Sequence, residues 1–354
     1  MGQVFKGRGA LGNPPARFLG RSMLPEDDGW YREELSDSIA TEIRPEAART
    51  IISRNDSPDI PFEQSINPYR GCEHGCVYCY ARPSHAYVDL SPGIDFETRL
   101  FYKADAAKLL RAELAKPGYR CSDIMLGANT DPYQPVEQRL RVTRSLLEVM
   151  LETRHPVSII TKGTLVLRDL DLLRELAQLN LTRVYVSLTT LDAELKRRLE
   201  PRTASPQARL RVIATLAAAG VPVGVMTAPM IPAINDAELE SLLEAAAQAG
   251  ARRAGYVLLR LPHELKTLFR DWLAEHYPER AAHVMSLVQQ ARGGQDNDPR
   301  FGARMRGSGA WAQLLRARFE LACRRLDLDR ERAAELATDL FRGQRASDQL
   351  ELEL

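Results

Sequence analysis

Residues 66–87 read INPYRGCEHGCVYCYARPSHAY, a cysteine-rich stretch from which the rest of the chain can be interpreted. It holds three of the five cysteines, Cys72, Cys76 and Cys79, in the spacing Cys-x3-Cys-x2-Cys. Thiolates this close together in a loop with glycines can turn inward to one centre, and an iron–sulfur cluster prefers an all-thiolate shell. A four-iron cluster bound by three thiolates keeps one iron with an open coordination position, which a metal site needs for chemistry. The loop therefore predicts a reactive [4Fe-4S] centre.

Zinc and disulfides are the alternatives for these cysteines. Zinc would need a fourth ligand, for which His74 or His85 is available. Zinc motifs, however, usually pair two short clips of cysteine or histidine, and no second clip follows in the sequence. Disulfides fit worse, because the cysteine count is odd and no apolar signal segment opens the chain. We therefore rank the cluster first, zinc second and disulfides last.

Length and composition are typical of a globular cytoplasmic enzyme. The chain has 354 residues, of which 44% are hydrophobic and 27% charged, so it can bury a large core and is not of disordered composition. No apolar run approaches the length that spans a membrane. The formal net charge is only +1, which gives the whole protein no strong electrostatic bias toward nucleic acid.

Strand and helix signals alternate from Pro61 onward. Six strands are expected, at residues 65–71, 123–128, 157–161, 183–188, 223–228 and 254–259. Helical apolar spacing lies between them, at residues 104–116, 137–151, 169–179 and 237–249 and in a helix that ends at Gly220. This alternation is the pattern of parallel β/α units. Periodicity alone does not separate a barrel from an open doubly wound sheet, but no glycine-rich dinucleotide fingerprint follows the first strand.

Polar residues follow the expected strands where a parallel barrel carries its working groups, at the carboxyl ends. Capping of the turn or of the following helix would explain Thr130 or Asp131 alone. The segment after the second strand, however, carries more polar groups than a turn needs: Asn129, Asp131, Tyr133, Gln134 and Glu137. Lys162 follows the third strand, where a lysine either reaches back to solvent or meets a negative partner. Ser187 ends the fourth strand. An ammonium and a hydroxyl beside an open iron suit a carboxylate ligand.

These motifs resemble those of the radical S-adenosylmethionine (SAM) superfamily, and within it the spore photoproduct lyase branch and the bacterial proteins grouped with it. The resemblance is carried by Cys-Val-Tyr-Cys-Tyr, which contains Tyr78 and Tyr80, and by Thr-Asp-Pro, Thr-Lys-Gly and Val-Ser-Leu after the second, third and fourth strands. It extends from Pro61 to Pro262, and the cysteine spacing is its most specific part. It implies a partial (β/α)6 barrel at residues 61–262, between an irregular basic extension at 1–60 and a helical region with a terminal tail at 263–354.

The resemblance also implies the cofactors. The three cysteines would hold a [4Fe-4S] cluster that cleaves bound S-adenosylmethionine reductively to a 5′-deoxyadenosyl radical, which abstracts hydrogen from a substrate. Tyr78 would contact the adenine, and Thr130, Lys162 and Ser187 the carboxylate. A reducing protein such as flavodoxin or ferredoxin is the implied partner.

One departure from the branch concerns the hydrogen donor. Photoproduct lyases place a hydrogen-donating cysteine at the end of the second strand, where this chain has Ala128 or Asn129, and Cys121 lies at the opposite end of that strand. Tyr80 or Tyr133 is the alternative hydrogen relay, with packing as the competing explanation. Because fold does not transmit reaction type, photoproduct repair is not inferred and the substrate stays open. The catalytic candidates are Tyr80, Asn129, Asp131 and Tyr133.

Basic segments outside the barrel raise a nucleic-acid alternative. Residues 1–22 carry four basic residues and no acidic one, which favours a solvated tail over an arm that wraps a polyanion or the barrel. Residues 300–325 carry seven arginines against one acid, with Phe301, Trp311 and Phe319 interleaved. That composition suits either a solvated face or a surface for single-stranded nucleic acid. The alternative function is a zinc- or cluster-stabilised nucleic-acid-binding module without radical chemistry.

The last residues, Gln349–Leu354, read QLELEL. This pattern resembles the short peptide by which bacterial repair and replication proteins dock on the sliding clamp. Alternate leucines of an extended peptide can fill apolar pockets while its backbone pairs with an edge. Packing of the same leucines on the barrel is the competing explanation, and we prefer it.

Overall fold

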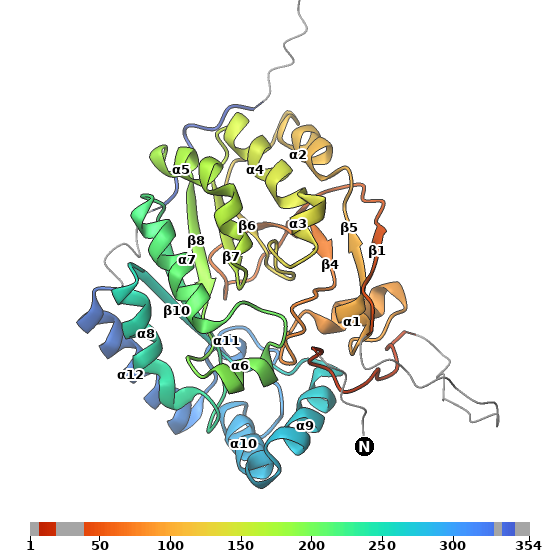
Figure 1. Ribbon diagram of the computed structural model, residues 1–354, viewed down its shortest axis with the longest axis vertical. Coiled ribbons are helices and arrows are strands. Elements are labelled where there is room, and N and C mark those ends of the chain that lie inside the picture. Colours follow the sequence, from red (N-terminus) through yellow and green to blue (C-terminus); the bar gives the residue numbers. More distant parts are fainter. Residues whose placement is uncertain (1–6, 19–38, 329–334, 344–354) are drawn as a thin grey trace, which may run out of the picture.

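The computed structural model describes residues 7–18, 39–328 and 335–343, and a seven-stranded sheet forms its centre (Figure 1). The strands lie in the spatial order β10-β9-β8-β7-β6-β3-β2. Their bounds are β2 (Ile52–Arg54), β3 (Gln64–Ile66), β6 (Ile124–Leu126), β7 (Val157–Thr161), β8 (Thr182–Ser187), β9 (Val223–Met230) and β10 (Arg253–Leu258). The peptide Gln349–Leu354 lies outside the described residues, so its docking on a sliding clamp stays a prediction.

Six of these strands are parallel and neighbour one another in sequence order. β3 pairs with β6, and each strand from β6 to β9 pairs with the next one, always in parallel register. A doubly wound sheet reverses its strand order, and the described sheet has no such reversal. β2 lies antiparallel to β3 and forms one edge, while β10 forms the other. The predicted α/β class with six parallel strands is confirmed, in an open arrangement that is compatible with a partial barrel.

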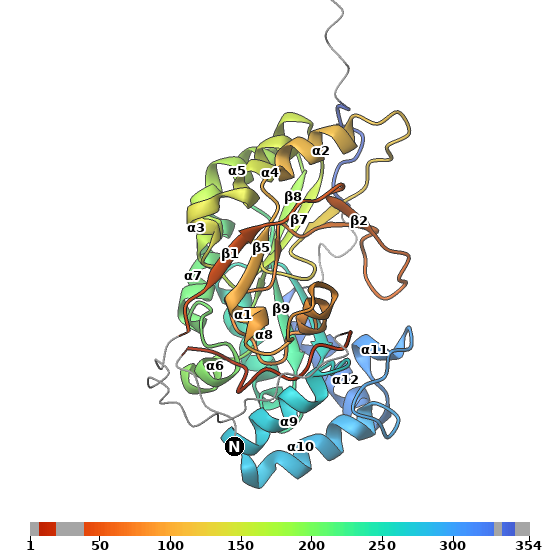
Figure 2. The same ribbon diagram turned by 90° about the vertical axis from the view of Figure 1, so that its right-hand side faces the viewer.

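Helices connect the parallel strands and cover the outer face of the sheet (Figures 1 and 2). They are α2 (Ala106–Leu114), α3 (Glu137–Leu140), α4 (Val142–Glu152), α5 (Leu170–Gln178), α6 (Ala193–Leu199), α7 (Pro206–Ala218) and α8 (Leu239–Gln248). α5 illustrates how these helices pack on the sheet: Leu172, Leu173 and Leu176 recur at helical spacing, and all three are buried on one face of the helix. Within the described ranges, no helix has both the length and the apolar content needed to cross a membrane.

The expected helix at 137–151 is divided into α3 and α4. Arg141 adopts a left-handed conformation, with φ of 54°, between the two. The buried carboxylate of Glu137 accepts a hydrogen bond from the backbone N–H of Thr143 at 3.0 Å. This satisfies one of the N–H groups at the start of α4 that have no partner within the helix. The apolar spacing continues through the break, so the sequence pattern could not reveal it.

A small second sheet lies beside the main one. It has the order β1-β5-β4, formed by β1 (Glu42–Pro45), β5 (Arg99–Tyr102) and β4 (Tyr69–Arg70). The expected first strand at 65–71 is therefore split at Pro68 between two sheets. Strands β1 and β2 both precede Pro61, so regular structure begins earlier than expected, while the division into three domains stays a prediction.

Four helices follow β10, namely α9 (Leu265–His276), α10 (Pro278–Ala291), α11 (Ala303–Arg306) and α12 (Gly309–Leu326). α12 lies beside α8, and α9 and α10 lie at the bottom of the molecule in Figure 1. Further short helices are α1 (Asp95–Thr98) and three 3₁₀ segments, at Arg82–Val88, Leu165–Asp169 and Asp236–Glu238.

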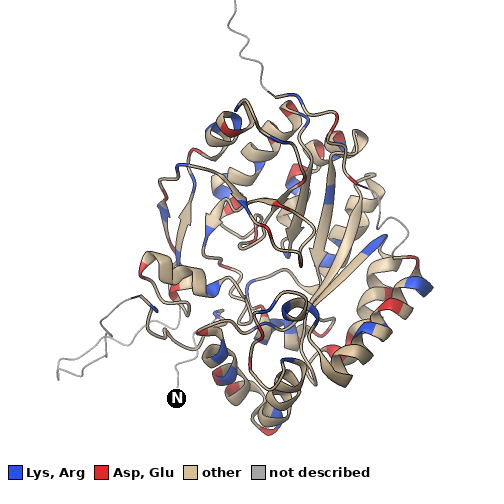
Figure 3. Cartoon of the chain, turned by 180° about the vertical axis from the view of Figure 1, so that it is seen from behind, with Lys and Arg blue, Asp and Glu red and all other residues tan. Residues whose placement is uncertain are grey.

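The arginines of residues 300–325 have acidic neighbours. Four of the seven pair with carboxylates, namely Arg300 with Asp298, Arg304 with Asp59, Arg316 with Glu320 and Arg318 with Glu240. Acidic residues lie among the basic ones on the C-terminal helices (Figure 3). Phe319 is buried and the Trp311 indole donates to Asp236, so Phe301 alone of the three aromatic residues is exposed. These contacts favour the solvated, acid-partnered interpretation over a nucleic-acid surface.

Candidate active site

The cysteine loop follows β4 at the carboxyl edge of the parallel strands. Gly71 and Gly75 have φ of +76° and +68°, a conformation that glycine adopts without strain. The Cys72 N–H donates to the Phe96 carbonyl at 2.9 Å, and the Cys79 N–H donates to the Cys76 carbonyl at 3.2 Å. These turns hold the three cysteines within eight residues of a loop that lies at the carboxyl edge of the parallel strands.

All three loop cysteines are free thiols; Cys72 and Cys76 are buried and Cys79 is half-buried. Burial raises the pKa of Cys72, and the charges of Asp131, Cys76 and Cys79 raise it further. Burial, followed by the charge of Glu200, raises the pKa of Cys76 to about 12. The thiols therefore influence one another, and a bound cation is the kind of group that would make them thiolates.

The donor set fits a cluster better than a single ion. Within the described part of the chain, no three His, Cys, Asp or Glu side chains gather closely enough to hold one metal ion. Zinc requires all its thiolates at about 2.3 Å from one atom, whereas a cluster binds each thiolate through a different iron. Each expected zinc donor has one ring nitrogen in contact with another group: His74 Nδ1 lies 3.2 Å from Asp131 and His85 Nε2 lies 2.9 Å from the Arg99 carbonyl.

A buried ion pair supports the loop from beneath. Arg82 is fully buried, donates to the Cys76 carbonyl at 2.9 Å and pairs with Glu97 at 2.5 Å. The Glu97 carboxylate also accepts the backbone N–H groups of Gly9 and Ala10, at 3.0 and 2.9 Å. The N-terminal segment is thereby tied to the loop that carries the cysteines.

The expectation of a solvated N-terminal tail is wrong for residues 8–10, which are buried. Gly9 packs so tightly on the loop that a Cβ atom there would lie 1.8 Å from the Gly75 carbonyl oxygen. Arg8 is buried and donates to the Glu97 carbonyl at 3.0 Å rather than facing water. Composition suggested solvation because such contacts depend on residues far along the chain.

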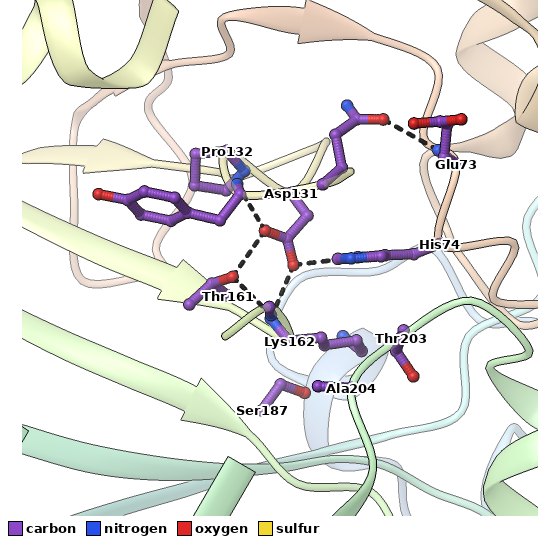
Figure 4. Close-up of polar contacts among 12 residues, drawn as sticks. Glu73, His74, Asp131, Pro132, Thr161, Lys162, Ser187, Thr203 and Ala204 are labelled. Atoms are coloured by element: carbon purple, nitrogen blue, oxygen red, sulfur yellow. Dashed lines mark hydrogen bonds and ion pairs between the residues drawn. The ribbon is translucent and has the colours of Figure 1, made fainter. Parts of the chain in front are cut away.

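Asp131 joins three segments of the site (Figure 4). Its buried carboxylate accepts the Tyr133 N–H at 2.9 Å, the Thr161 hydroxyl at 2.7 Å and the Lys162 N–H at 2.7 Å, and it lies 3.2 Å from His74 Nδ1. Burial alone would raise its pKa, but the His74 charge and these hydrogen bonds lower the pKa of Asp131 to about 2. Asp131 therefore ties the turn after β6 to the end of β7 and to the cysteine loop.

Lys162 and Ser187 lie side by side after neighbouring strands, because Thr161 of β7 is paired with Val186 of β8. The Lys162 ammonium is 6.0 Å from the ring centre of Tyr78. Burial lowers the pKa of Lys162, but the charges of Cys76 and Glu200 outweigh burial and leave it raised. Figure 4 shows Lys162 and Ser187 on the same side of Asp131. Three of the four residues expected to contact SAM thus gather at one place.

The remaining candidates occupy different environments. The Thr130 hydroxyl is buried and donates to the Tyr69 carbonyl at 2.9 Å. Asn129 is exposed, and its backbone N–H donates to the Asn67 side chain at 2.8 Å. Tyr133 is fully buried in the main hydrophobic core, and burial followed by the charge of Asp169 raises its pKa. The Tyr133 N–H and the Lys162 N–H share the Asp131 carboxylate, while the Tyr133 ring lies in the core.

Tyr80 lies at the mouth of the site and is 44% exposed. Its hydroxyl donates to the Ala128 carbonyl, just beyond the end of β6. The Arg260 guanidinium lies 5.3 Å from its ring centre. Desolvation of the hydroxyl, followed by the Cys79 charge, raises the pKa of Tyr80 to about 12. Tyr80 is therefore a neutral ring and hydroxyl next to the last loop cysteine.

Sequence interpretation missed a buried network behind Tyr78. Glu200 is completely buried; it forms an ion pair with Arg209 and accepts hydrogen bonds from the hydroxyl of Tyr78 and, at 2.7 Å, from that of Thr189. Burial opposes its ionisation, but the charges of Arg209 and Lys162 lower the pKa of Glu200 to about 2. Arg209 also donates to the Ser187 carbonyl at 2.9 Å. This Glu200 network connects the residues expected at the adenine and at the carboxylate of SAM.

The segment around Glu200 also holds the backbone of the cysteine loop. The Val77 N–H donates to the Leu199 carbonyl at 3.1 Å, and the Arg202 N–H donates to the His74 carbonyl at 3.3 Å. Glu200 and Arg209 lie nine positions apart, on either side of the start of α7, and no local sequence pattern indicates that they pair. The one available indication was that both residues follow the fourth expected strand, at the end of the sheet where functional residues of parallel β/α folds lie.

Comparisons with known proteins identify the family of the chain. The family model described as the Radical SAM superfamily matches residues 66–246, more than half of the chain. An uncharacterized protein of Mycobacterium tuberculosis is 41% identical over 233 residues, covering 65% of this chain and 68% of that protein. An uncharacterized protein of Methanocaldococcus jannaschii is 28% identical over 173 residues, covering 49% and 62% respectively.

Solved structures share the fold. A mutant of spore photoproduct lyase is similar with a TM-score of 0.58 and 17% identity, covering 80% of this chain and 78% of that one. A spore photoproduct lyase mutant with bound AdoMet and dinucleoside spore photoproduct has a TM-score of 0.50 at 17% identity, covering 67% and 66%. From the family model and the relatives together, the chain belongs to the radical SAM superfamily, whose enzymes use a [4Fe-4S] cluster and S-adenosylmethionine.

Proposed function

We propose that Cys72, Cys76 and Cys79 hold the [4Fe-4S] cluster of this enzyme. The observation that carries the proposal is the placement of three free thiols on one loop, next to the carboxyl ends of consecutive parallel strands. When bound, the cluster would supply the electron that splits S-adenosylmethionine into methionine and a 5′-deoxyadenosyl radical, which abstracts hydrogen from the substrate. The other residues of the site bind and orient.

Lys162 is proposed to pair with the methionyl carboxylate of SAM, with Ser187 beside it. The Lys162 side chain is half-buried, and among the described residues it forms no ion pair, so its ammonium can take a ligand carboxylate. Tyr78 is proposed to face the adenine, because its hydroxyl is fixed by Glu200 and its ring lies near Lys162. Thr130 has less support, since its hydroxyl proton is already given to a backbone carbonyl.

The four catalytic candidates fall into two groups. Tyr80 and Asn129 are exposed at the carboxyl edge and can meet a substrate. Tyr133 lies in the core, and the Asp131 carboxylate is occupied by four contacts. We therefore retain Tyr80 and Asn129 as substrate-facing residues and assign Asp131 and Tyr133 to positioning and packing.

A small reducing protein such as flavodoxin or ferredoxin is proposed as the electron donor. A substrate that is part of a nucleic acid remains the second hypothesis, although the arginine partners on α12 do not favour a binding surface there. Crosslinking to oligonucleotides at several salt concentrations tests it, because phosphate contacts weaken steeply as salt rises.

Anaerobic reconstitution tests the proposed function. The wild-type protein should take up about four iron and four sulfide per chain, show the broad visible absorption of a cluster, and form 5′-deoxyadenosine from SAM with dithionite or reduced flavodoxin. The paramagnetic resonance spectrum of the reduced cluster should change when SAM is added. Stoichiometric zinc uptake without iron or sulfide would instead establish the zinc-stabilised binding module.

A further inference from the structure

A group of arginines lies at the carboxyl end of β10, beside the cysteine loop. Arg260 follows β10 by two residues, and its guanidinium stands over the ring of Tyr80, the residue after Cys79. The Tyr80 hydroxyl reaches the Ala128 carbonyl after β6, on the opposite side of the sheet order from β10. Arg260 therefore faces the mouth of the same site that holds the loop cysteines.

Two neighbouring arginines have partners of their own. Arg304 on α11 pairs with Asp59 at 2.5 Å. Arg292 is buried and donates to four backbone carbonyls at 2.6–3.2 Å. Burial, followed by repulsion from Arg260, lowers the pKa of Arg292 to about 10. Within the described residues, the ion pair recorded for these three arginines is the one between Arg304 and Asp59, and the nearby Asp298 is paired with Arg300.

Among the residues that the structure describes, Arg260 is the arginine of this group that forms no ion pair and donates to no carbonyl. Its Nε is buried with no hydrogen-bond acceptor, and its one recorded hydrogen bond runs to the Met305 sulfur at 3.7 Å, a weak acceptor. A desolvated charge that lacks a counter-ion is costly. The planar fork of a guanidinium matches a phosphate or carboxylate with two parallel hydrogen bonds. A bound oxyanion would satisfy both the charge and the buried donor.

We propose that Arg260 and Tyr80 form a substrate subsite that binds an oxyanion, the phosphate or carboxylate group of the molecule presented to the radical. This inference rests on the proposed function, because the subsite adjoins the loop proposed to hold the cluster. The exposed ring of Tyr80 supplies a flat apolar surface next to the charge. The subsite is separate from the proposed methionyl carboxylate site at Lys162, which lies after β7 rather than β10.

The test is calorimetric titration of the reconstituted holoenzyme at constant ionic strength, with saturating SAM so that the methionyl carboxylate site is filled. Pyrophosphate and citrate are the two probes, and tighter binding of one identifies the subsite as one for phosphate or for carboxylate. Arg260→Gln should weaken binding of the preferred probe about ten- to a hundredfold. Arg260→Lys should weaken it less, because it keeps the charge and loses only the fork.

Arg316→Gln is the matched control, since it removes the same charge from an exposed arginine on α12 that is paired with Glu320. Its affinity for the probe should stay within about twofold of wild type. The subsite is refuted if Arg260→Gln binds both probes as wild type does, or if wild type binds neither saturably. Formation of 5′-deoxyadenosine by wild type is measured on the same preparation, and its absence would count against the proposed function instead.

Discussion

Replacing Glu200 by Gln should lower the free energy of unfolding of the apo protein by about 3–5 kcal/mol, the usual cost of breaking a buried ion pair on one side. The Glu200 and Arg209 side chains are 0% and 2% exposed. Gln retains the shape and can still accept the hydrogen bond of the Tyr78 hydroxyl. The guanidinium of Arg209, however, would remain buried without its counter-ion, and this accounts for most of the expected loss.

Glu194→Gln is the control, because Glu194 also pairs with an arginine, Arg198, but on the surface. Those side chains are 57% and 32% exposed, so their pair contributes about 0–1 kcal/mol. Urea unfolding followed by circular dichroism at pH 7 gives both free energies, and an unchanged m-value shows that the compared states are equivalent. A loss below about 1 kcal/mol for Glu200→Gln, no larger than that of Glu194→Gln, would refute the buried-network argument.

The same pair predicts a pH dependence. The pKa of Glu200 is lowered from its ordinary value of 4.5 to about 2 in the folded protein. A lowered folded-state pKa means that this stabilisation is fully present above pH 4.5 and is lost as the pH falls through about 2. The stability difference between wild type and Glu200→Gln should therefore be constant from pH 6 to 8 and narrow only in acid, in unfolding curves recorded at each pH.

Three further predictions concern the cofactor site. Cys76→Ala should abolish iron and sulfide uptake and SAM cleavage, whereas Cys323→Ala, in the core of α12, should leave both largely intact; iron analysis and product chromatography decide, and an active Cys76→Ala enzyme would overturn the ligand assignment. Lys162→Met should weaken SAM binding about ten- to a hundredfold by removing a charge-assisted contact of roughly 1.5–3 kcal/mol. Equilibrium dialysis measures this, and unchanged affinity with a normal cluster spectrum would mean that the lysine only reaches solvent. Gly9→Ala should reduce cluster loading because its Cβ would meet the Gly75 carbonyl, whereas Gly12→Ala adds a Cβ to open space and serves as control; equal iron content in the two variants would contradict the packing argument.

Local chemistry made much of the fold and part of the site predictable. The cysteine spacing is specific enough to indicate the metal chemistry. Each parallel strand contains a short apolar run, and helices cover the outer face of the sheet that these strands form. Lys162 and Ser187 could be selected because residues that end neighbouring parallel strands meet at one edge. These inferences need no knowledge of distant contacts.

Other features depend on contacts between distant residues and left no local trace. Glu200 follows an amphipathic helix and reads as an ordinary solvated charge, yet it is completely buried against Tyr78, 122 positions away. Arg8 and Gly9 sit in a basic, glycine-containing stretch that reads as a tail, yet they pack on residues 73–97. Hydropathy assigns charged residues to the surface, and it fails where a charge is buried with its partner.

Three buried carboxylates hold the cysteine loop, each from a different element. Glu97 pairs with Arg82 beneath the loop, Asp131 lies against His74 within it, and Glu200 binds Tyr78 between its second and third cysteines. Apolar residues of similar size would give comparable or greater stability, because desolvation offsets most of the attraction in a buried pair. Apolar packing would not, however, fix which carbonyl and which hydroxyl each side chain meets. The directional contacts therefore explain how the loop can be held in one conformation before any cofactor binds.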